Sequence, residues 1–256
     1  MKVVYFGPAG TFSQQAAGIM CQNAELIPAS DIDSVFETAM CVGTGIVPLE
    51  NSTEGVVNAT LDALLKWKEL FITEAYIMPI RHTFIGHENP IEILAHPQAL
   101  AQCKGYLRKY YPNVTLIPSA SNGEAARLVA ASDKRKAAIG PLAAAKVYNL
   151  PIIAENIQDQ DTNSTTFIKV QKAPSKGPRT SIAFSTENKP GDLLRIIRIF
   201  DKHKVNMCNI LSRPLPQRPG EYVFFVDLDD CPKEILEQVK KESIIYRFIG
   251  SYLIQS

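Results

Sequence analysis

The stretch KAAIGPLAAAKVYNLPIIAENIQD, residues 136–159, alternates between two kinds of pattern. A short apolar run ends at Gly140-Pro141, an alanine-rich segment follows, and a second apolar run begins after Pro151. Short apolar runs on either side of a helical segment are typical of strand–helix–strand units. This stretch therefore predicts an α/β fold with largely parallel sheets.

The same alternation extends over most of the chain before residue 170. We expect helices over residues 11–20, 30–40, 51–67 and 97–111, and a single long strand over residues 71–86. The strand near 76–86 and a return near 152–157 predict two lobes joined by crossing strands. This geometry resembles that of periplasmic binding proteins, which bind their ligand in a cleft between two lobes.

A change of composition separates the C-terminal part of the chain. Residues 171–179, QKAPSKGPR, combine Pro, Lys, Ser and Gly without apolar periodicity, as linkers do. The chain beyond them has the pattern βαββαβ, the order of ferredoxin-like domains. We therefore expect one domain over residues 1–172 and a second over residues 179–256.

Composition and charge restrict the function classes. A formal net charge of +1 argues against binding to nucleic acid or to an anionic membrane. No run approaches the ~20 apolar residues of a membrane-spanning helix, and the apolar N-terminal run is too short for a signal peptide. The five cysteines lack CxxC spacing, so free thiols in a reducing cytosol are favoured over a disulfide framework or a metal site.

The turn in GPAGTFSQQAA, residues 7–17, leads from a strand into a helix. A Gly-rich turn at a helix start presents free backbone N–H groups that suit a carboxylate or phosphate. Thr11 and Ser13 add hydroxyl donors. The alternative interpretation is an ordinary capped helix.

A second polar turn follows the strand that ends in VPLE. Glu50, Asn51 and Ser52 lie there, and Asn51 and Ser52 could instead cap the helix expected after them. Because both turns follow strand ends, they predict a common crevice for a small anionic ligand.

Two further segments carry candidate residues. In IRHTFIG, His82 is either a binding residue or a structural one, and Arg81 alternates to the other face of the strand. In AHPQALAQC, residues 95–103, the turn at His96-Pro97 is either a third anion-facing helix start or a simple cap.

The run NSTTFIKV, residues 163–170, places hydroxyl side chains at the start of an apolar strand. Asn163 and Ser164 suit a turn. Thr165 then begins a strand that would return toward the cleft.

These segments together resemble prephenate dehydratase over essentially the whole chain. The resemblance is carried, in order, by GPAGTFSQQAA, PLENSTEGVVNATLD, AHPQALAQC, AAIGPLAAAKVYNLPIIAENIQD and NSTTF. PGDLL and LSRP then resemble parts of an ACT regulatory domain. The resemblance implies a cytoplasmic enzyme of phenylalanine biosynthesis that converts prephenate to phenylpyruvate, carbon dioxide and water without a metal or an organic cofactor. It also implies a homodimer or homotetramer whose ACT domains bind L-phenylalanine.

The resemblance also implies roles for individual residues. The family motif Asn-x-Thr-Arg-Phe places its proton-donating threonine at Thr165. A threonine hydroxyl is a weak acid, so neighbours must assist it, and Asn51, Ser52 and Asn163 are the candidates. Together with the candidates named above, the expected substrate-binding residues are Thr11, Ser13, Glu50, His82, Asn163, Thr166 and Phe167, with Phe167 forming a wall beside the ring.

One position departs from the family pattern. Thr166 stands where the family has an arginine, which can clamp a carboxylate with two hydrogen bonds. Three interpretations remain open. Another cation, such as Arg81, compensates and the enzyme is a dehydratase; the reaction has changed to prephenate decarboxylation without dehydration; or catalysis is lost and the protein is a small-molecule sensor.

The expected effector site departs as well. The family's Gly-Ala-Leu reads Gly191, Asp192 and Leu193 here, and its Glu-Ser-Arg-Pro begins with Leu211, Ser212 and Arg213. Asp192 would repel the carboxylate of an amino acid or hold its ammonium group. The ACT-like unit is therefore interpreted either as a phenylalanine site or as a dimerisation unit alone.

Overall fold

A computed structural model describes residues 1–132, 135–215 and 220–256 of the chain. Contacts divide it into two compact units. The first consists of Met1–Thr60, Tyr76–Phe167 and Ser256, and the second of Leu61–Ala75 and Ile168–Gln255. Strands β5 (Phe71–Pro79) and β11 (Ser164–Gln171) contribute residues to both units. No helix of the described residues is long and apolar enough to cross a membrane.

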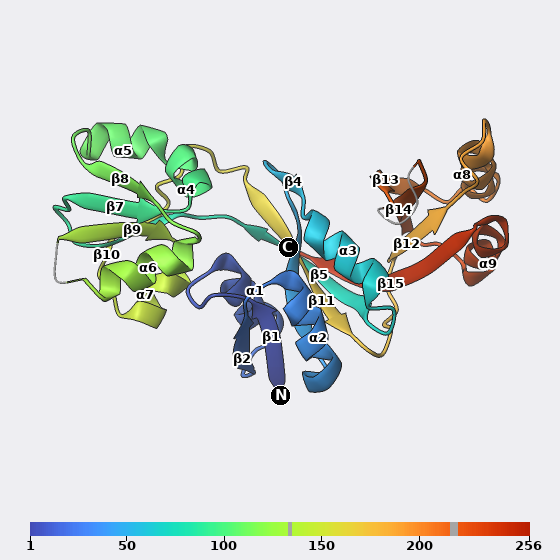
Figure 1. Ribbon diagram of the computed structural model, residues 1–256, viewed down its shortest axis with the longest axis horizontal. Coiled ribbons are helices and arrows are strands. Elements are labelled where there is room, and N and C mark those ends of the chain that lie inside the picture. Colours follow the sequence, from blue (N-terminus) through green and yellow to red (C-terminus); the bar gives the residue numbers. More distant parts are fainter. Residues whose placement is uncertain (133–134, 216–219) are drawn as a thin grey trace. The chain divides into compact units, whose positions relative to one another are not determined.

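The N-terminal sheet of the first unit has the strand order β11-β3-β1-β2. Its strands include β1 (Lys2–Phe6), β2 (Glu25–Ala29) and β3 (Gly45–Asn51), and β1 pairs parallel with both neighbours. Helices α1 (Phe12–Met20) and α2 (Ile32–Val42) flank these strands (Figure 1). Each helix begins at the residue type that helix starts favour: Thr11 caps α1 and Asp31 caps α2 through their side-chain oxygens.

A second sheet completes the first unit, in the order β10-β6-β9-β7-β8. The strands are β6 (Thr83–Gly86), β7 (Glu92–Ala95), β8 (Thr115–Pro118), β9 (Lys136–Gly140) and β10 (Ile152–Ala154). β7 is parallel to β8 and β9, whereas β6 is antiparallel to β9 and β10. The sheet is therefore mixed rather than largely parallel. A connection as short as that between β6 and β7 reverses the chain, because parallel strands need a crossover of a dozen residues or more.

Four helices accompany this sheet (Figure 1). They are α4 (Pro97–Gln102), α5 (Lys104–Tyr110), α6 (Asn122–Ala130) and α7 (Leu142–Tyr148). The prediction of one helix over 97–111 is wrong, because the helix is interrupted at Cys103. Both carboxylate oxygens of Asp159 accept the N–H of Gly105 at 3.0 Å, so a distant residue supplies the acceptor at the start of α5.

The helix expected over 51–67 begins later than predicted. Asn51 ends β3, a turn follows, and β4 (Gly55–Val56) pairs back antiparallel with β3 before α3 (Asn58–Lys66) starts. Gly55 has a φ of 82°, a conformation that glycine adopts without a steric penalty. Asn51 and Ser52 therefore lie in a hairpin turn and cap no helix.

The single strand expected over 71–86 is two strands. β5 ends at Pro79 and β6 begins at Thr83, so Arg81 and His82 lie in the irregular segment between them. Proline has no backbone N–H to donate to a neighbouring strand, which favours the end of a strand at this position.

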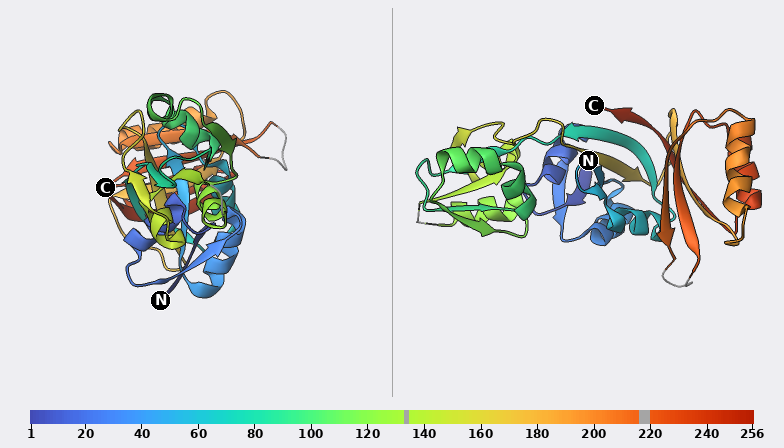
Figure 2. Two further views of the ribbon diagram at one scale, coloured as in Figure 1. Left: turned by 90° about the vertical axis from the view of Figure 1, so that its left-hand side faces the viewer. Right: turned by 90° about the horizontal axis from the view of Figure 1, so that it is seen from above.

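The second unit contains the expected βαββαβ order. Its elements are β12 (Arg179–Ser185), α8 (Asp192–Lys202), β13 (Met207–Pro214), β14 (Tyr222–Asp229), α9 (Lys233–Glu242) and β15 (Ile245–Gln255). The strand order is β13-β14-β12-β15-β5, and β12 is antiparallel to β14 and β15. Figure 2 shows α8 and α9 on the same face of this sheet, where Ile196 and Phe200 pack with Ile182 and Phe184.

A buried cation holds the segment 61–75 within the second unit. Arg247 of β15 is 8% exposed, and its guanidinium donates to the carbonyl oxygens of Phe248 at 2.7 Å and Leu70 at 2.6 Å. It also lies 4.8 Å from the centre of the Phe71 ring. Burial lowers the pKa of this side chain, because the charged form loses its hydration. Backbone carbonyls and the aromatic ring compensate for part of this cost.

The contact between β15 and β5 leaves no room for a side chain at Gly250. A Cβ there would lie 2.2 Å from the carbonyl oxygen of Ile72. We predict that Gly250→Ala lowers the free energy of unfolding by about 1–3 kcal/mol, as overpacking of a well-packed interior does. Gly18→Ala is the control, because a Cβ there meets no atom within 4 Å and alanine favours the α1 helix. Urea unfolding measures both variants, and equal stabilities would contradict the packing argument.

Candidate active site

The side chain of Asn51 joins the turn after β3 to the start of β11. Its Nδ2 group donates to Asn163 Oδ1 at 2.9 Å, to the carbonyl oxygen of Ser164 at 3.1 Å and to Thr165 Oγ1 at 2.9 Å. Its Oδ1 accepts the N–H groups of Thr53 and Glu54. The two oxygen contacts orient the amide, so Nδ2 faces β11.

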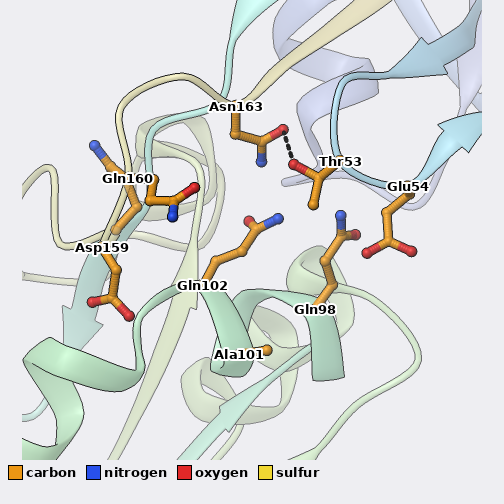
Figure 3. A pocket seen from close by; sticks show the side chains of 9 residues that line it. Thr53, Glu54, Gln98, Ala101, Gln102, Asp159, Gln160 and Asn163 are labelled. Carbon is orange, nitrogen blue, oxygen red and sulfur yellow. Dashed lines mark hydrogen bonds between the residues drawn. The ribbon is translucent and has the colours of Figure 1, made fainter.

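Ser52 reinforces the same junction. Its Oγ accepts the N–H of Ser164 at 3.0 Å and donates to Asn163 Oδ1 at 3.3 Å. Thr53 Oγ1 donates to the same oxygen at 3.4 Å. Three donors therefore hold Asn163 Oδ1, and Figure 3 shows the Nδ2 group of Asn163 directed toward Gln102.

Two adjoining cavities open beside this cluster. The small cavity, of about 70 Å³, is lined by Thr165, Asn51 and Asn163 together with Phe12, His82 and Asn122. The large cavity, of about 280 Å³, is lined by Thr53, Glu54, Gln160 and Asp159 among others. Gln98, Gln102 and Asn163 line both cavities. In Figure 3, Gln98 and Gln102 project from α4 toward Thr53 and Asn163.

His82 is a buried wall of the small cavity, with 2% of its surface exposed. Its Nε2 lies 2.8 Å from Gln102 Oε1, so Nε2 carries the proton and donates. The ring packs edge-on against Phe12, with centroids 5.5 Å apart. Burial lowers the pKa of His82, since the imidazolium would lose its hydration, and the bond to Gln102 opposes this only in part. The side chain is therefore neutral.

The expected helix start at GPAGTFSQQAA also reaches the site. Phe12, the first residue of α1, lines the small cavity, while Thr11 caps the helix by accepting the N–H of Gln14. Ser13 is buried and lines neither cavity. The start of α6 lies beside this turn, because a Cβ on Gly123 would meet the carbonyl oxygen of Ala9 at 2.3 Å.

The cavity walls are polar but carry no cation. No lysine or arginine lines either cavity in the part of the chain that the structure describes. Arg81 is paired with Asp161, and both side chains are largely exposed. Carboxamides, hydroxyls and backbone N–H groups are therefore the available donors.

Besides Thr11 and Ser13, three expected substrate-binding residues line neither cavity. Thr166 alternates with Thr165 along β11 and so faces the other side of the strand. Phe167 is 2% exposed, packs in the core with Tyr5 and lines neither cavity, although alternation places it on the same face of β11 as Thr165. Glu50 is exposed on β3 and lines neither cavity.

Comparisons with known proteins identify the family. The family model for prephenate dehydratase matches residues 3–175. The prephenate dehydratase of Methanocaldococcus jannaschii is 35% identical over 98% of this chain and 97% of its own. The chain belongs to the prephenate dehydratase family.

Two further relatives of this prephenate dehydratase family member cover nearly its whole length. The bifunctional chorismate mutase/prephenate dehydratase of Pseudomonas aeruginosa is 37% identical over 98% of this chain and 73% of its own. The crystal structure of prephenate dehydratase in complex with L-Phe from Arthrobacter aurescens is 30% identical, with a TM-score of 0.88, over 98% of this chain and 90% of that one.

Sequence analysis missed Gln98, Gln102 and Asn122 as cavity residues of the dehydratase. Gln98 and Gln102 are four residues apart in AHPQALAQC, so a helix places them on one face. That spacing could have indicated that both amides face the same site. Asn122 gave none, because the packing of α6 against distant segments brings it to the small cavity, where it also accepts the N–H of His96 at 2.9 Å.

The residues expected to bind an effector lie in the second unit. Gly191, with a φ of 90°, precedes α8, and Asp192 begins that helix near Arg195. Leu193 packs against the core of the unit. Arg213 is already paired, with Nη2 donating to both carboxylate oxygens of Asp62 at 2.8 and 2.9 Å. Leu211 and Ser212 precede it on β13.

The lowered pKa of His82 predicts a dependence of stability on pH. As pH falls below about 6.5, the ordinary value, the unfolded chain binds a proton at this residue before the folded chain does. The free energy of unfolding therefore decreases on acidification from neutral pH. We predict a smaller decrease in His82→Gln, measured by urea unfolding at a series of pH values. The control is His203→Gln, an exposed position, and an unchanged slope in His82→Gln would contradict the prediction.

Proposed function

We propose that Asn51, Ser52, Asn163 and Thr165 carry out the decarboxylating dehydration of prephenate to phenylpyruvate in L-phenylalanine biosynthesis. The observation that carries this proposal is the 2.9 Å hydrogen bond from Asn51 Nδ2 to Thr165 Oγ1. Because Thr165 accepts this bond, its own O–H is available to a ligand in the small cavity.

The dehydration requires a proton donor for the ring hydroxyl of prephenate, which leaves as water. When the bond between the ring and its carboxylate breaks, the electrons enter the ring, carbon dioxide leaves, and the hydroxyl departs with its bonding pair. Thr165 O–H supplies the proton that turns the departing oxygen into water, and solvent returns a proton to Thr165. Asn51 Nδ2 stabilises the negative charge that develops on Oγ1. Aromatisation of the ring drives the reaction, so the proposal requires no metal or organic cofactor.

The carboxylates of prephenate require donors from elsewhere. Backbone N–H groups at the start of α1 and the amides of Gln98, Gln102 and Asn163 are the donors nearest the cavities. The dehydratase interpretation is thus compatible with Thr166, because an arginine there would extend from the other face of β11. An available hydroxyl donor favours dehydration over decarboxylation alone and over a role as a sensor.

We predict that Thr165→Ala lowers kcat by about 10²–10⁴-fold, the usual contribution of a positioned proton donor. Phenylpyruvate absorbance and product masses after incubation with prephenate measure the effect. Thr165→Ser is the matched control, because it keeps the hydroxyl, and it should keep most of the rate. A near wild-type rate in Thr165→Ala would exclude the donor role, and a product that retains the ring hydroxyl would establish decarboxylation instead.

A substitution at Thr166 tests which face of β11 this residue occupies, with the same prephenate turnover assay. Thr166→Arg is expected to leave KM for prephenate unchanged, because alternation along β11 directs residue 166 away from Thr165. A lower KM would show that this position faces the substrate.

The proposal extends to the rest of the chain. The two sheets of the first unit act as two lobes around the substrate, as in periplasmic binding proteins, within a catalytic domain over residues 1–172. Residues 179–256 form an ACT domain that binds L-phenylalanine and pairs in a homodimer or homotetramer in the cytoplasm. The βαββαβ order and the L-Phe named with the Arthrobacter aurescens structure support this extension.

The ion pair between Arg213 and Asp62 allows a test of the effector site. We predict that L-phenylalanine inhibits turnover, and that Arg213→Met and Asp62→Asn change its affinity by the same factor, because Arg213 is occupied by Asp62. Calorimetric titration with L-phenylalanine measures both variants. A larger loss in Arg213→Met would assign Arg213 a direct contact with the effector, and no binding by the wild type would leave the domain a role in assembly alone.

A further inference from the structure

His82 lines the small cavity, and one of its ring nitrogens has no hydrogen-bond partner among the described residues. The side chain is 98% buried, since 2% of it is exposed. Nε2 is bound to Gln102 Oε1, but Nδ1 contacts no donor among residues 1–132, 135–215 and 220–256. Because Nε2 carries the proton, Nδ1 presents a lone pair. A buried acceptor of this kind needs a hydrogen-bond donor.

Thr165 presents the opposite group to the same cavity. Its oxygen accepts from Asn51 Nδ2 at 2.9 Å, and no acceptor for its O–H lies within the described part of the chain. The cavity, of about 70 Å³, thus has one acceptor wall and one donor wall. A cavity of this volume has room for an oxygen atom of a ligand.

The chemistry of the two walls selects the group that fits between them. It must donate one hydrogen bond, to His82 Nδ1, and accept another, from Thr165. A hydroxyl does both. A carboxylate has no proton to donate and would meet the lone pair of Nδ1, while an ether oxygen only accepts.

We propose that the small cavity is a hydroxyl subsite, in which the ring hydroxyl of the substrate donates to His82 Nδ1 and accepts from Thr165 Oγ1. The inference rests on the proposed function, and it assigns His82 a role as a specificity-determining residue. Donation to His82 turns a lone pair of the departing oxygen toward Thr165 O–H, the orientation that proton transfer needs.

The surroundings fix His82 in this role. Its backbone N–H donates to Gln158 Oε1 at 2.9 Å, and its carbonyl oxygen accepts the N–H of Ile157 at 3.0 Å. Phe12 covers one edge of the ring. His82 is therefore held both at its backbone and at its ring.

The experiment compares two unreactive ligands by calorimetry. One is prephenate with both ring double bonds hydrogenated, which cannot aromatise, and the other is the same compound without the hydroxyl. We expect the wild type to bind the hydroxyl compound about tenfold more tightly, the value of one well-placed hydrogen bond. In His82→Gln this ratio should fall toward one, because glutamine reproduces the contact to Gln102 but not Nδ1. In His82→Asn, whose Oδ1 can occupy the position of Nδ1, much of the ratio should return.

The ratio of the two ligand affinities distinguishes recognition of the hydroxyl by His82 from a merely structural role of this residue. Equal losses for both ligands in His82→Gln, with the ratio unchanged, would overturn the proposal, as would a wild type that does not distinguish the ligands. Turnover of prephenate is measured in parallel. If the wild type turns over prephenate normally but binds the two ligands equally, the hydroxyl subsite is refuted and the dehydratase function stands. If it prefers the hydroxyl ligand but does not turn over prephenate, the subsite is upheld and the function is refuted. Circular dichroism confirms the fold of each variant.

Discussion

The hydrogen bonds of one side chain, Asn51, connect the parts of the candidate site. Its oxygen closes the turn between β3 and β4, and its nitrogen reaches three acceptors at the start of β11. The two strand segments are more than 100 residues apart in the chain. Thr165 obtains its polarising donor from this contact, and Asn163 its orientation. The position of Thr165, the proposed proton donor, therefore depends on a turn that the Asn51 carboxamide holds.

The small cavity is lined by neutral side chains, although prephenate carries two carboxylates. Amides and hydroxyls line both cavities, Glu54 and Asp159 also line the large one, and His82 is neutral because burial lowers its pKa. A buried cation without a partner would carry a large desolvation cost. Neutral donors avoid that cost, and each one forms a directional hydrogen bond that needs an acceptor opposite it. The hydroxyl subsite proposed above depends on this directionality.

Sequence patterns failed where a tertiary contact replaced a local one. The Ser/Thr-rich start after Glu50 has the composition of a helix cap, but Asn51 binds its own turn and β11 instead. Local preferences for capping and for turn formation use the same residue types, so the sequence alone does not separate them. The break at Cys103 depends in the same way on Asp159, which lies more than 50 residues further along the chain.

The sequence by itself determined the α/β class and the βαββαβ order of the C-terminal part, and it singled out Asn51, Asn163 and Thr165, which the structure brings together at one cavity. Periodicity and turn chemistry are local properties, so a sequence reveals them directly, and the ordered motifs were sufficient to identify the family. Tertiary structure alone decided that the sheets are mixed, that Thr166 and Phe167 lie away from the cavities, and that Gln102, Asn122 and His82 line them. Which side chains share a cavity depends on how distant segments pack, and packing is not encoded in any short stretch of residues.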